Sequence, residues 1–128
     1  MLLKRKKETL SIGRLGEALA FEYLLRQRYV IVEKNYRKQC GEVDIIARDG
    51  ETLVFVEVKT RQSTAFGTPF EAVDARKQRQ LSRIAQEYIQ SRRLGEAPAR
   101  FDVIAVRLHR DNQPPALDHL KNAFDFVL

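Results

Sequence analysis

The residues around Asp44 and Glu57 are of the types that phosphodiester chemistry needs. Asp44 lies in the run Gly41-Glu42-Val43-Asp44-Ile45-Ile46, and Glu57 follows thirteen residues later, two positions before Lys59. The Asp49-Gly50 pair between them is typical of a hairpin, which would fold Asp44 back beside Glu57. Glu57 and Lys59 share one strand face because side chains alternate. Two carboxylates suit Mg²⁺ or Mn²⁺, and a metal with a lysine can activate water and neutralise a phosphate.

The same pattern has a simpler interpretation. An acid and a lysine two positions apart also occur as an ordinary ion pair on a solvated sheet face. Here Leu53 and Phe55 precede Glu57 on its own face, so the charges arise where an apolar strand emerges. Sites in α/β proteins tend to lie at strand ends. On the residues alone, the catalytic and structural interpretations are about evenly balanced.

Glu17 is a further candidate, in a predicted helix. It shares a helix face with Gly13, Ala20 and Leu24, a stripe of small and apolar residues suited to packing. A buried carboxylate needs a partner. The residues themselves favour a glutamate at the helix edge, paired with Arg14 or Arg28, over a metal ligand.

The elements that would position these residues follow from hydrophobic pattern and turn signals. We predict a helix over 11–28 with Ser11 as N-cap, strands over 29–37, 42–47 and 52–60, a helix over 75–93, and strands over 100–108 and 122–128. Asp74 is the expected cap of the second helix and Gly95 its stop, and loops are expected over 62–69 and 111–118. Residues 1–9 are expected to form a flexible basic arm and 10–128 a single domain. This order predicts an α/β sandwich with a mixed sheet.

The charge of the chain favours a polyanionic partner. Lys and Arg number 23 against 17 Asp and Glu, for a formal charge of +6. The second predicted helix alone carries six basic residues against Glu87. The basic residues expected to contact phosphates are Lys4, Arg5, Lys6, Lys7, Arg61, Lys77 and Arg79. We expect Asp102 to be structural, and His109 and His119 to be ordinary loop residues.

Other classes of protein are disfavoured. No apolar run approaches the 18 or so residues that a membrane span needs, and the N-terminus turns basic without an apolar segment behind it. Cys40 is the only cysteine, which forbids an internal disulfide. We therefore expect a cytoplasmic protein with no membrane association and no small-molecule cofactor.

A set of short motifs covers roughly residues 11–108. They are Gly16-Glu17, Asn35-Tyr36-Arg37, Gly41 to Ala47, Val54 to Arg61, Gly67 with Pro69, Glu71-Ala72-Val73 and Phe101 to Ile104. Together they resemble the bacterial YraN family, an uncharacterised group placed in the restriction-endonuclease-like superfamily near the archaeal Holliday junction resolvases.

The resemblance implies a restriction-endonuclease-like αβββαβ core, with a mixed central sheet flanked by helices, and a Mg²⁺-dependent endonuclease site acting on DNA. Carried over by position, Asp44 and Glu57 are its metal carboxylates, Lys59 its catalytic lysine and Glu17 its helix-borne acid, a third metal ligand. Symmetric cutting of a four-way junction would call for a homodimer.

Two other functions stay open at this stage. The chain could be a non-catalytic nucleic-acid-binding module that keeps a nuclease-like fold, or a protein-interaction domain whose positive charge meets an acidic partner. Metal-independent binding without cleavage would favour the first, and an absence of salt-sensitive DNA binding the second.

Overall fold

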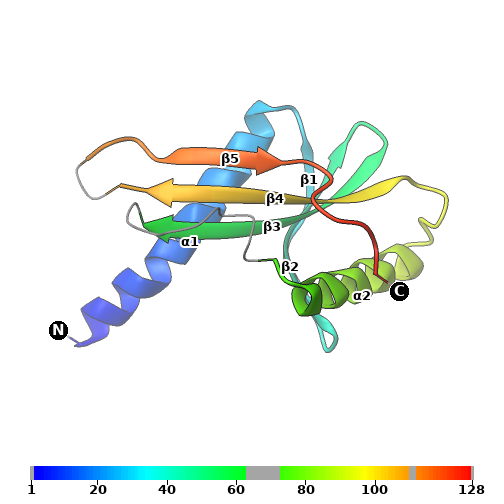
Figure 1. The fold of residues 1–128 in the computed structure, drawn as a ribbon, viewed down its shortest axis with the longest axis horizontal. Helices are drawn as coiled ribbons and strands as arrows, with labels where there is room; N and C mark the ends of the chain where they lie inside the picture. The colour runs from blue at the N-terminus through cyan, green and yellow to red at the C-terminus, as the bar shows by residue number, and fades with distance from the viewer. Residues whose placement is uncertain (1, 63–72, 110–111, 128) are drawn as a thin grey trace.

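One mixed sheet of five strands organises the fold (Figure 1). A computed structural model describes residues 2–62, 73–109 and 112–127, with side chains described from Ile12 onward. The elements are α1 (Leu2–Arg26), β1 (Val30–Lys38), β2 (Gly41–Asp49), β3 (Thr52–Gln62), α2 (Ala75–Ser91), β4 (Ala99–Leu108) and β5 (Ala116–Leu120). The loop predicted over 62–69 is wrong at Gln62, which ends β3, and its residues 63–69 lie outside the described residues.

The strands lie in the order β1-β2-β3-β4-β5. Strands β3 and β4 run parallel, whereas β1–β2, β2–β3 and β4–β5 are antiparallel. Parallel neighbours need a crossover connection, and α2 lies between β3 and β4 in the chain. The predicted Asp49-Gly50 hairpin is confirmed, because Asp49 pairs with Thr52 and Gly50 has a left-handed φ of 62°. The mixed sheet flanked by helices is therefore confirmed.

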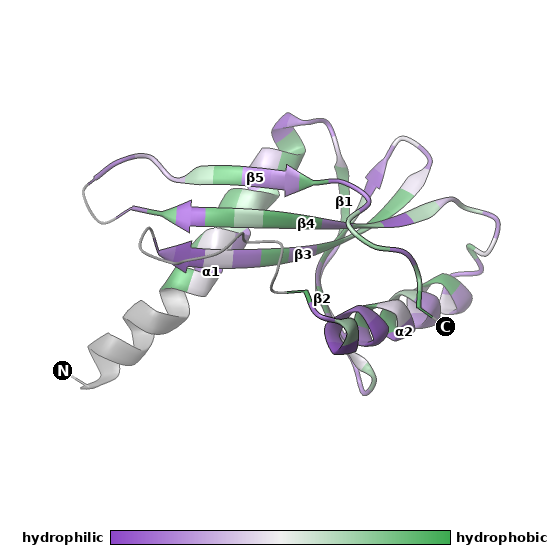
Figure 2. Ribbon diagram, viewed as in Figure 1, coloured by the Kyte–Doolittle hydropathy of each residue, from purple (hydrophilic) through white to green (hydrophobic). Residues whose placement is uncertain are grey.

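The two helices cover opposite faces of this sheet. Ala20 and Leu24 of α1 belong to a buried cluster with the side chains of Val54, Val56 and Ile104. The other face packs against α2 in a cluster of Leu81, Ile84, Tyr88, Phe55 and Phe101. Burial on both faces explains why β3 begins as a continuous apolar run. The neighbouring strand β4 is likewise hydrophobic, and green, along its middle in Figure 2. No helix among the described residues has the length and apolar character to cross a membrane.

Helix α1 begins much earlier than the sequence predicts. Its backbone is helical from Leu2, so Ser11 lies inside the helix and the prediction of Ser11 as N-cap is wrong. Residues 2–10 have good helix formers and no proline, and the helix continues through them. The mobility of the first nine residues and the domain boundary at residue 10 stay predictions.

Gly16 lets α1 approach the end of β3. A Cβ atom placed on Gly16 would lie 1.8 Å from Thr60 Oγ1, whereas one placed on Gly13 meets nothing within 4 Å. We expect Gly16→Ala to lower the free energy of unfolding by about 2 kcal/mol, because helix and strand must move apart. Chemical denaturation measures this change.

The matched control is Gly13→Ala in the same helix. It is exposed, so alanine is expected to raise the free energy of unfolding by about 0.5 to 1 kcal/mol through helix propensity alone. Two substitutions that shift stability in the same direction would contradict the close approach at Gly16.

The ends of α2 follow the prediction at one terminus only. The Asp74 carboxylate accepts the Lys77 backbone N–H at 2.9 Å, which confirms Asp74 as the N-cap. The prediction of Gly95 as the stop is wrong. Arg93 takes the left-handed conformation with φ 55°, and Leu94 N–H donates to the Ile89 carbonyl at 2.9 Å, so a non-glycine residue closes the helix two positions earlier.

The C-terminal region differs from the prediction. The last strand is β5, over Ala116–Leu120, in place of the predicted loop over 111–118 and strand over 122–128. The described residues after Leu120 are irregular, and Phe124 and Phe126 pack on the Phe101 ring with centroids 4.6 and 4.5 Å apart. The β-forming aromatics that suggested a strand are thus partly buried residues that pack against the core from a non-strand segment.

A buried charge network joins α1 to β4 and β5. Asp102 is fully buried and contacts Arg100 Nε at 3.0 Å and His119 Nε2 at 2.7 Å. His119 Nδ1 lies 2.9 Å from the hydroxyl of Tyr23 on α1, so His119 is a network residue on β5 and its prediction as a loop residue is wrong. Burial alone would raise the pKa of Asp102, but hydrogen bonds from His119, Arg100 and the Asn122 backbone outweigh it and lower that pKa. Both oxygens of the Asp102 carboxylate have hydrogen-bond partners, as expected of a structural residue.

Candidate active site

Asp44 lies where β2 and β3 stop pairing. The last ladder pair between the two strands is Ile45 with Val56, while β3 continues beside β4 as far as Gln62. Beyond that pair the Val58 backbone N–H donates to Asp44 Oδ2 at 2.8 Å. A carboxylate therefore accepts the hydrogen bond that a strand carbonyl would otherwise take.

The regular alternation of side chains along β2 is interrupted at Asp44. Val43 belongs to the core under α2 and Ile45 to the core under α1, although a regular strand would place both on one face. On β1 the opposite position is Asn35, between the pairs Lys34–Ile45 and Tyr36–Val43, and it has a left-handed φ of 53°. Asparagine tolerates that conformation better than most residues.

Glu57 is the buried acid of the site. Its side chain is 7% exposed, and Oε2 lies 3.3 Å from the ammonium of Lys77 on α2. Among the described residues this buried oxygen accepts no hydrogen bond. An unsatisfied buried carboxylate oxygen is costly and usually has a ligand, an ion or water to explain it.

The carboxylates perturb one another. Burial, followed by the neighbouring Glu57 carboxyl and then Glu17, raises the pKa of Asp44 to about 8, although the Val58 N–H opposes the shift. The hairpin prediction that Asp44 returns beside Glu57 therefore holds. Two acids this close are difficult to ionise together unless a cation joins them.

Glu17 reaches the same region from α1. Burial, then the carboxylates of Glu42 and Glu57, raises the pKa of Glu17, while Lys34 and an interaction with the Asp44 carboxyl oppose this. Within the described side chains Glu17 forms no ion pair with Arg14 or Arg28, the helix-edge alternative. The structure thus places Glu17 beside Asp44.

The three acids do not converge on one point. In the described part of the chain, no group of three or more His, Cys, Asp or Glu side chains lies close enough together to hold a metal ion. Asp44 and Glu57 nevertheless fit a hard cation such as Mg²⁺, which proteins often bind through one or two carboxylates with water completing the shell. The unsatisfied oxygen of Glu57 supports this fit.

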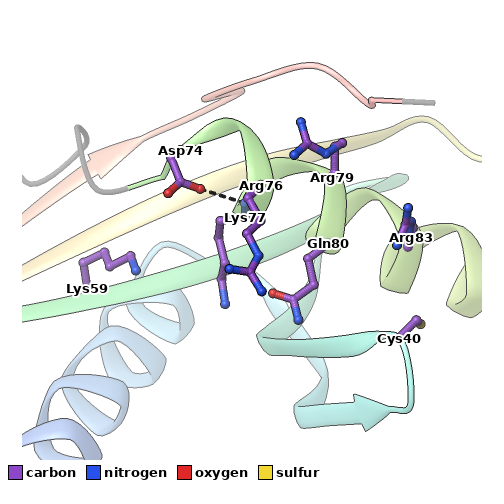
Figure 3. A pocket seen from close by; sticks show the side chains of 8 residues that line it. All are labelled: Cys40, Lys59, Asp74, Arg76, Lys77, Arg79, Gln80 and Arg83. Carbon is purple, nitrogen blue, oxygen red and sulfur yellow. Dashed lines mark hydrogen bonds between the residues drawn. The ribbon is translucent and has the colours of Figure 1, made fainter.

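A basic hollow adjoins the acids, with a volume of about 590 Å³. Its wall is formed by Cys40, Lys59, Asp74, Arg76, Lys77, Arg79, Gln80 and Arg83. Figure 3 shows Lys59 reaching from β3 toward the side chains of α2. Among these described residues, five cations against one acid give the hollow a strong preference for anions. Lys77 links the two parts, because it lines the hollow and contacts Glu57.

Sequence reasoning located part of this arrangement. The structure brings Lys59, Lys77 and Arg79 into the hollow, whereas Arg61 is an exposed residue of β3 that does not line it. Lys4, Arg5, Lys6 and Lys7 have side chains outside the described residues. Arg76 and Arg83 were missed, although their positions at i and i+7 of the predicted helix, with Arg79 at i+3, place all three on one side.

The order of elements and the mixed central sheet define the class of fold, an αβββαβ nuclease-like core. The family model of the uncharacterised protein family UPF0102 matches residues 16–106. The chain belongs to this family, which is the YraN family that the sequence motifs indicate.

Relatives of similar length support the assignment. A UPF0102 protein of Geotalea uraniireducens is 52% identical over 117 residues, covering 91% of each chain. A UPF0102 protein of Syntrophus aciditrophicus is 45% identical over 126 residues and 98% of each chain. A third, of Moorella thermoacetica, is 47% identical over 112 residues, which are 88% of this chain and 93% of the relative.

Proposed function

We propose that this protein is an endonuclease that hydrolyses phosphodiester bonds of DNA with Mg²⁺ or Mn²⁺. The observation that carries the proposal is the pair of neighbouring acids, Asp44 and Glu57, beside a hollow walled by five cations. Mutually repelling carboxylates, one of them buried with an oxygen that has an ion pair to Lys77 but accepts no hydrogen bond among the described residues, are unfavourable for folding alone. A divalent cation would neutralise the two carboxylates, and a phosphate would neutralise the basic side chains of the hollow.

The position of each residue in the site indicates the role that we propose for it. Asp44 and Glu57 would hold the cation, with Glu17 beside Asp44 as the predicted third ligand. When bound, the cation acts as a Lewis acid and lowers the pKa of an attacking water. Lys59 projects into the hollow, where its ammonium would stabilise charge that grows on the phosphate in the transition state.

The α2 arginines would position the substrate. Arg76, Arg79 and Arg83 line the hollow, and guanidinium groups hold phosphates through paired N–H donors. Among the described residues that line the hollow there is no aromatic side chain on which a base could stack. With these arginines as the phosphate contacts, the proposal is recognition of the DNA backbone without base readout. The likeness of the motifs to Holliday junction resolvases makes branched DNA the first candidate substrate, cut by a homodimer.

The test is cleavage of end-labelled four-way junction, flap, single-stranded and linear duplex DNA in Mg²⁺, Mn²⁺ or EDTA. Metal-dependent cutting of at least one substrate is expected. Salt-sensitive binding without cutting on any substrate would instead support the non-catalytic nucleic-acid-binding module. Absence of salt-sensitive binding would support a protein-interaction domain.

A further inference from the structure

We infer that Lys77 is an internal counter-ion, which neutralises Glu57 in the metal-free protein and withdraws when the divalent cation binds. The inference rests on the proposed metal site at Asp44 and Glu57 and adds a positioning residue to it. It concerns how the site is kept folded before loading and what the cation must displace.

In the ion pair between Lys77 and Glu57, the carboxylate is buried and fixed, whereas the ammonium is partly exposed and can move. Lys77 Nζ lies 3.3 Å from Glu57 Oε2, and that oxygen accepts no hydrogen bond among the described residues. The Glu57 side chain is 7% exposed, whereas that of Lys77 is 32% exposed. The ammonium therefore neutralises the carboxylate by charge while remaining partly in water.

The backbone of Lys77 is held, so its side chain alone can move. Its N–H donates to the Asp74 carboxylate at the start of α2. The four-carbon stem of a lysine allows its ammonium to swing while the helix stays in place. Figure 3 shows the Lys77 side chain entering the same hollow as Lys59 and Arg76.

Withdrawal has a direct consequence for substrate binding. A cation that takes the Glu57 oxygen releases the Lys77 charge into the hollow, where four other basic side chains already lie. The released ammonium would then strengthen attraction for a phosphate. Loading of the metal would in this way prepare the hollow for DNA.

The test is Mn²⁺ binding to the metal-free full-length chain at pH 8, measured by calorimetry without DNA. Because a partly exposed ion pair contributes only modestly, Lys77→Gln is expected to bind Mn²⁺ about fivefold more tightly than the wild type. Lys77→Arg keeps the charge and is expected to stay near the wild type. Arg83→Gln removes a charge from the same hollow without touching Glu57, and less than about a twofold change is expected.

A second readout does not depend on affinity. In EDTA, Lys77→Gln is expected to melt below the wild type, because the buried carboxylate loses its partner, and to gain more from added Mn²⁺. Lys77→Arg should behave as the wild type does.

The outcomes separate this inference from the proposed function. Saturable Mn²⁺ binding that is equal in wild type and Lys77→Gln, or weaker in Lys77→Gln, overturns the counter-ion role and leaves the metal site intact. Equal tightening in Arg83→Gln also overturns it, since the general field would then be the cause. Absence of Mn²⁺ binding in every protein would overturn the metal site itself.

Discussion

Asp44→Asn is expected to abolish metal-dependent DNA cleavage and yet to make the metal-free protein more stable. The rate should fall at least about a thousandfold, because a cation ligand and the charge that it balances are lost together. Asparagine has nearly the same shape, and its amide oxygen can still accept the Val58 N–H that Asp44 accepts. Loss of cleavage would therefore not come from misfolding.

The gain in stability depends on pH in a defined direction. In the folded protein the pKa of Asp44 is raised from 3.8 to about 8, so folding takes up a proton between these values. Wild-type stability should therefore fall as pH rises through this window, and the Asn variant should not show that loss. At pH 8 in EDTA we expect the free energy of unfolding of Asp44→Asn to exceed that of the wild type by about 1 kcal/mol. At pH 4 this difference should disappear.

The control for both measurements is Glu51→Gln. Glu51 is an exposed acid at the tip of the β2–β3 hairpin, away from the site, so neither cleavage nor stability should change appreciably. Cleavage by Asp44→Asn within about tenfold of the wild type would contradict a ligand role. Loss of stability at pH 8 would contradict the argument that the acids repel one another.

The double substitution of Arg79 and Arg83 by glutamine is expected to weaken DNA binding about thirtyfold near 0.1 M salt. Both residues line the hollow, and a chain that neutralises fewer phosphates releases fewer counter-ions. The slope of the logarithm of affinity against the logarithm of salt concentration should therefore decrease by about 2 for duplex DNA. Fluorescence anisotropy with labelled DNA over a salt series in Ca²⁺ measures both quantities.

A matched double variant tests whether position or total charge is responsible. Arg48 and Lys121 are exposed basic residues that do not line the hollow. Their replacement by glutamine removes the same charge, and less than about a threefold loss of affinity is expected. If both double variants lose affinity and slope equally, binding follows net charge and the hollow has no special role.

Local sequence signals predicted most of the fold. Apolar β-branched runs marked β2, β3 and β4, and the Asp49-Gly50 pair fixed the register that returns Asp44 to Glu57. The amphipathic spacing from Leu81 to Ile89 identified α2, and Asp74 capped it as expected. Each of these signals concerns neighbours in the chain, where propensity and hydrogen bonding act over a few residues.

The features that were missed depend on contacts between distant segments. Arg93 rather than Gly95 ends α2, and β5 precedes the segment whose phenylalanines pack on Phe101. His119 acquires its role only when β5 carries it between Asp102 and Tyr23. The Lys77 contact with Glu57 joins α2 to β3 across twenty residues, and nothing in the sequence of either element specifies it.

The Asp44 carboxylate continues the hydrogen bonding between β2 and β3 just beyond their last backbone pair. The amide hydrogen of Val58 is bound by one carboxylate oxygen, whereas Val56 lies in the regular ladder with Ile45. Solvent exchange of the Val58 amide is therefore governed by the state of a single acid, and exchange at Val56 by opening of the strand pair. The difference in hydrogen-exchange rate between the Val58 and Val56 amides therefore reports whether a proton or a cation occupies Asp44.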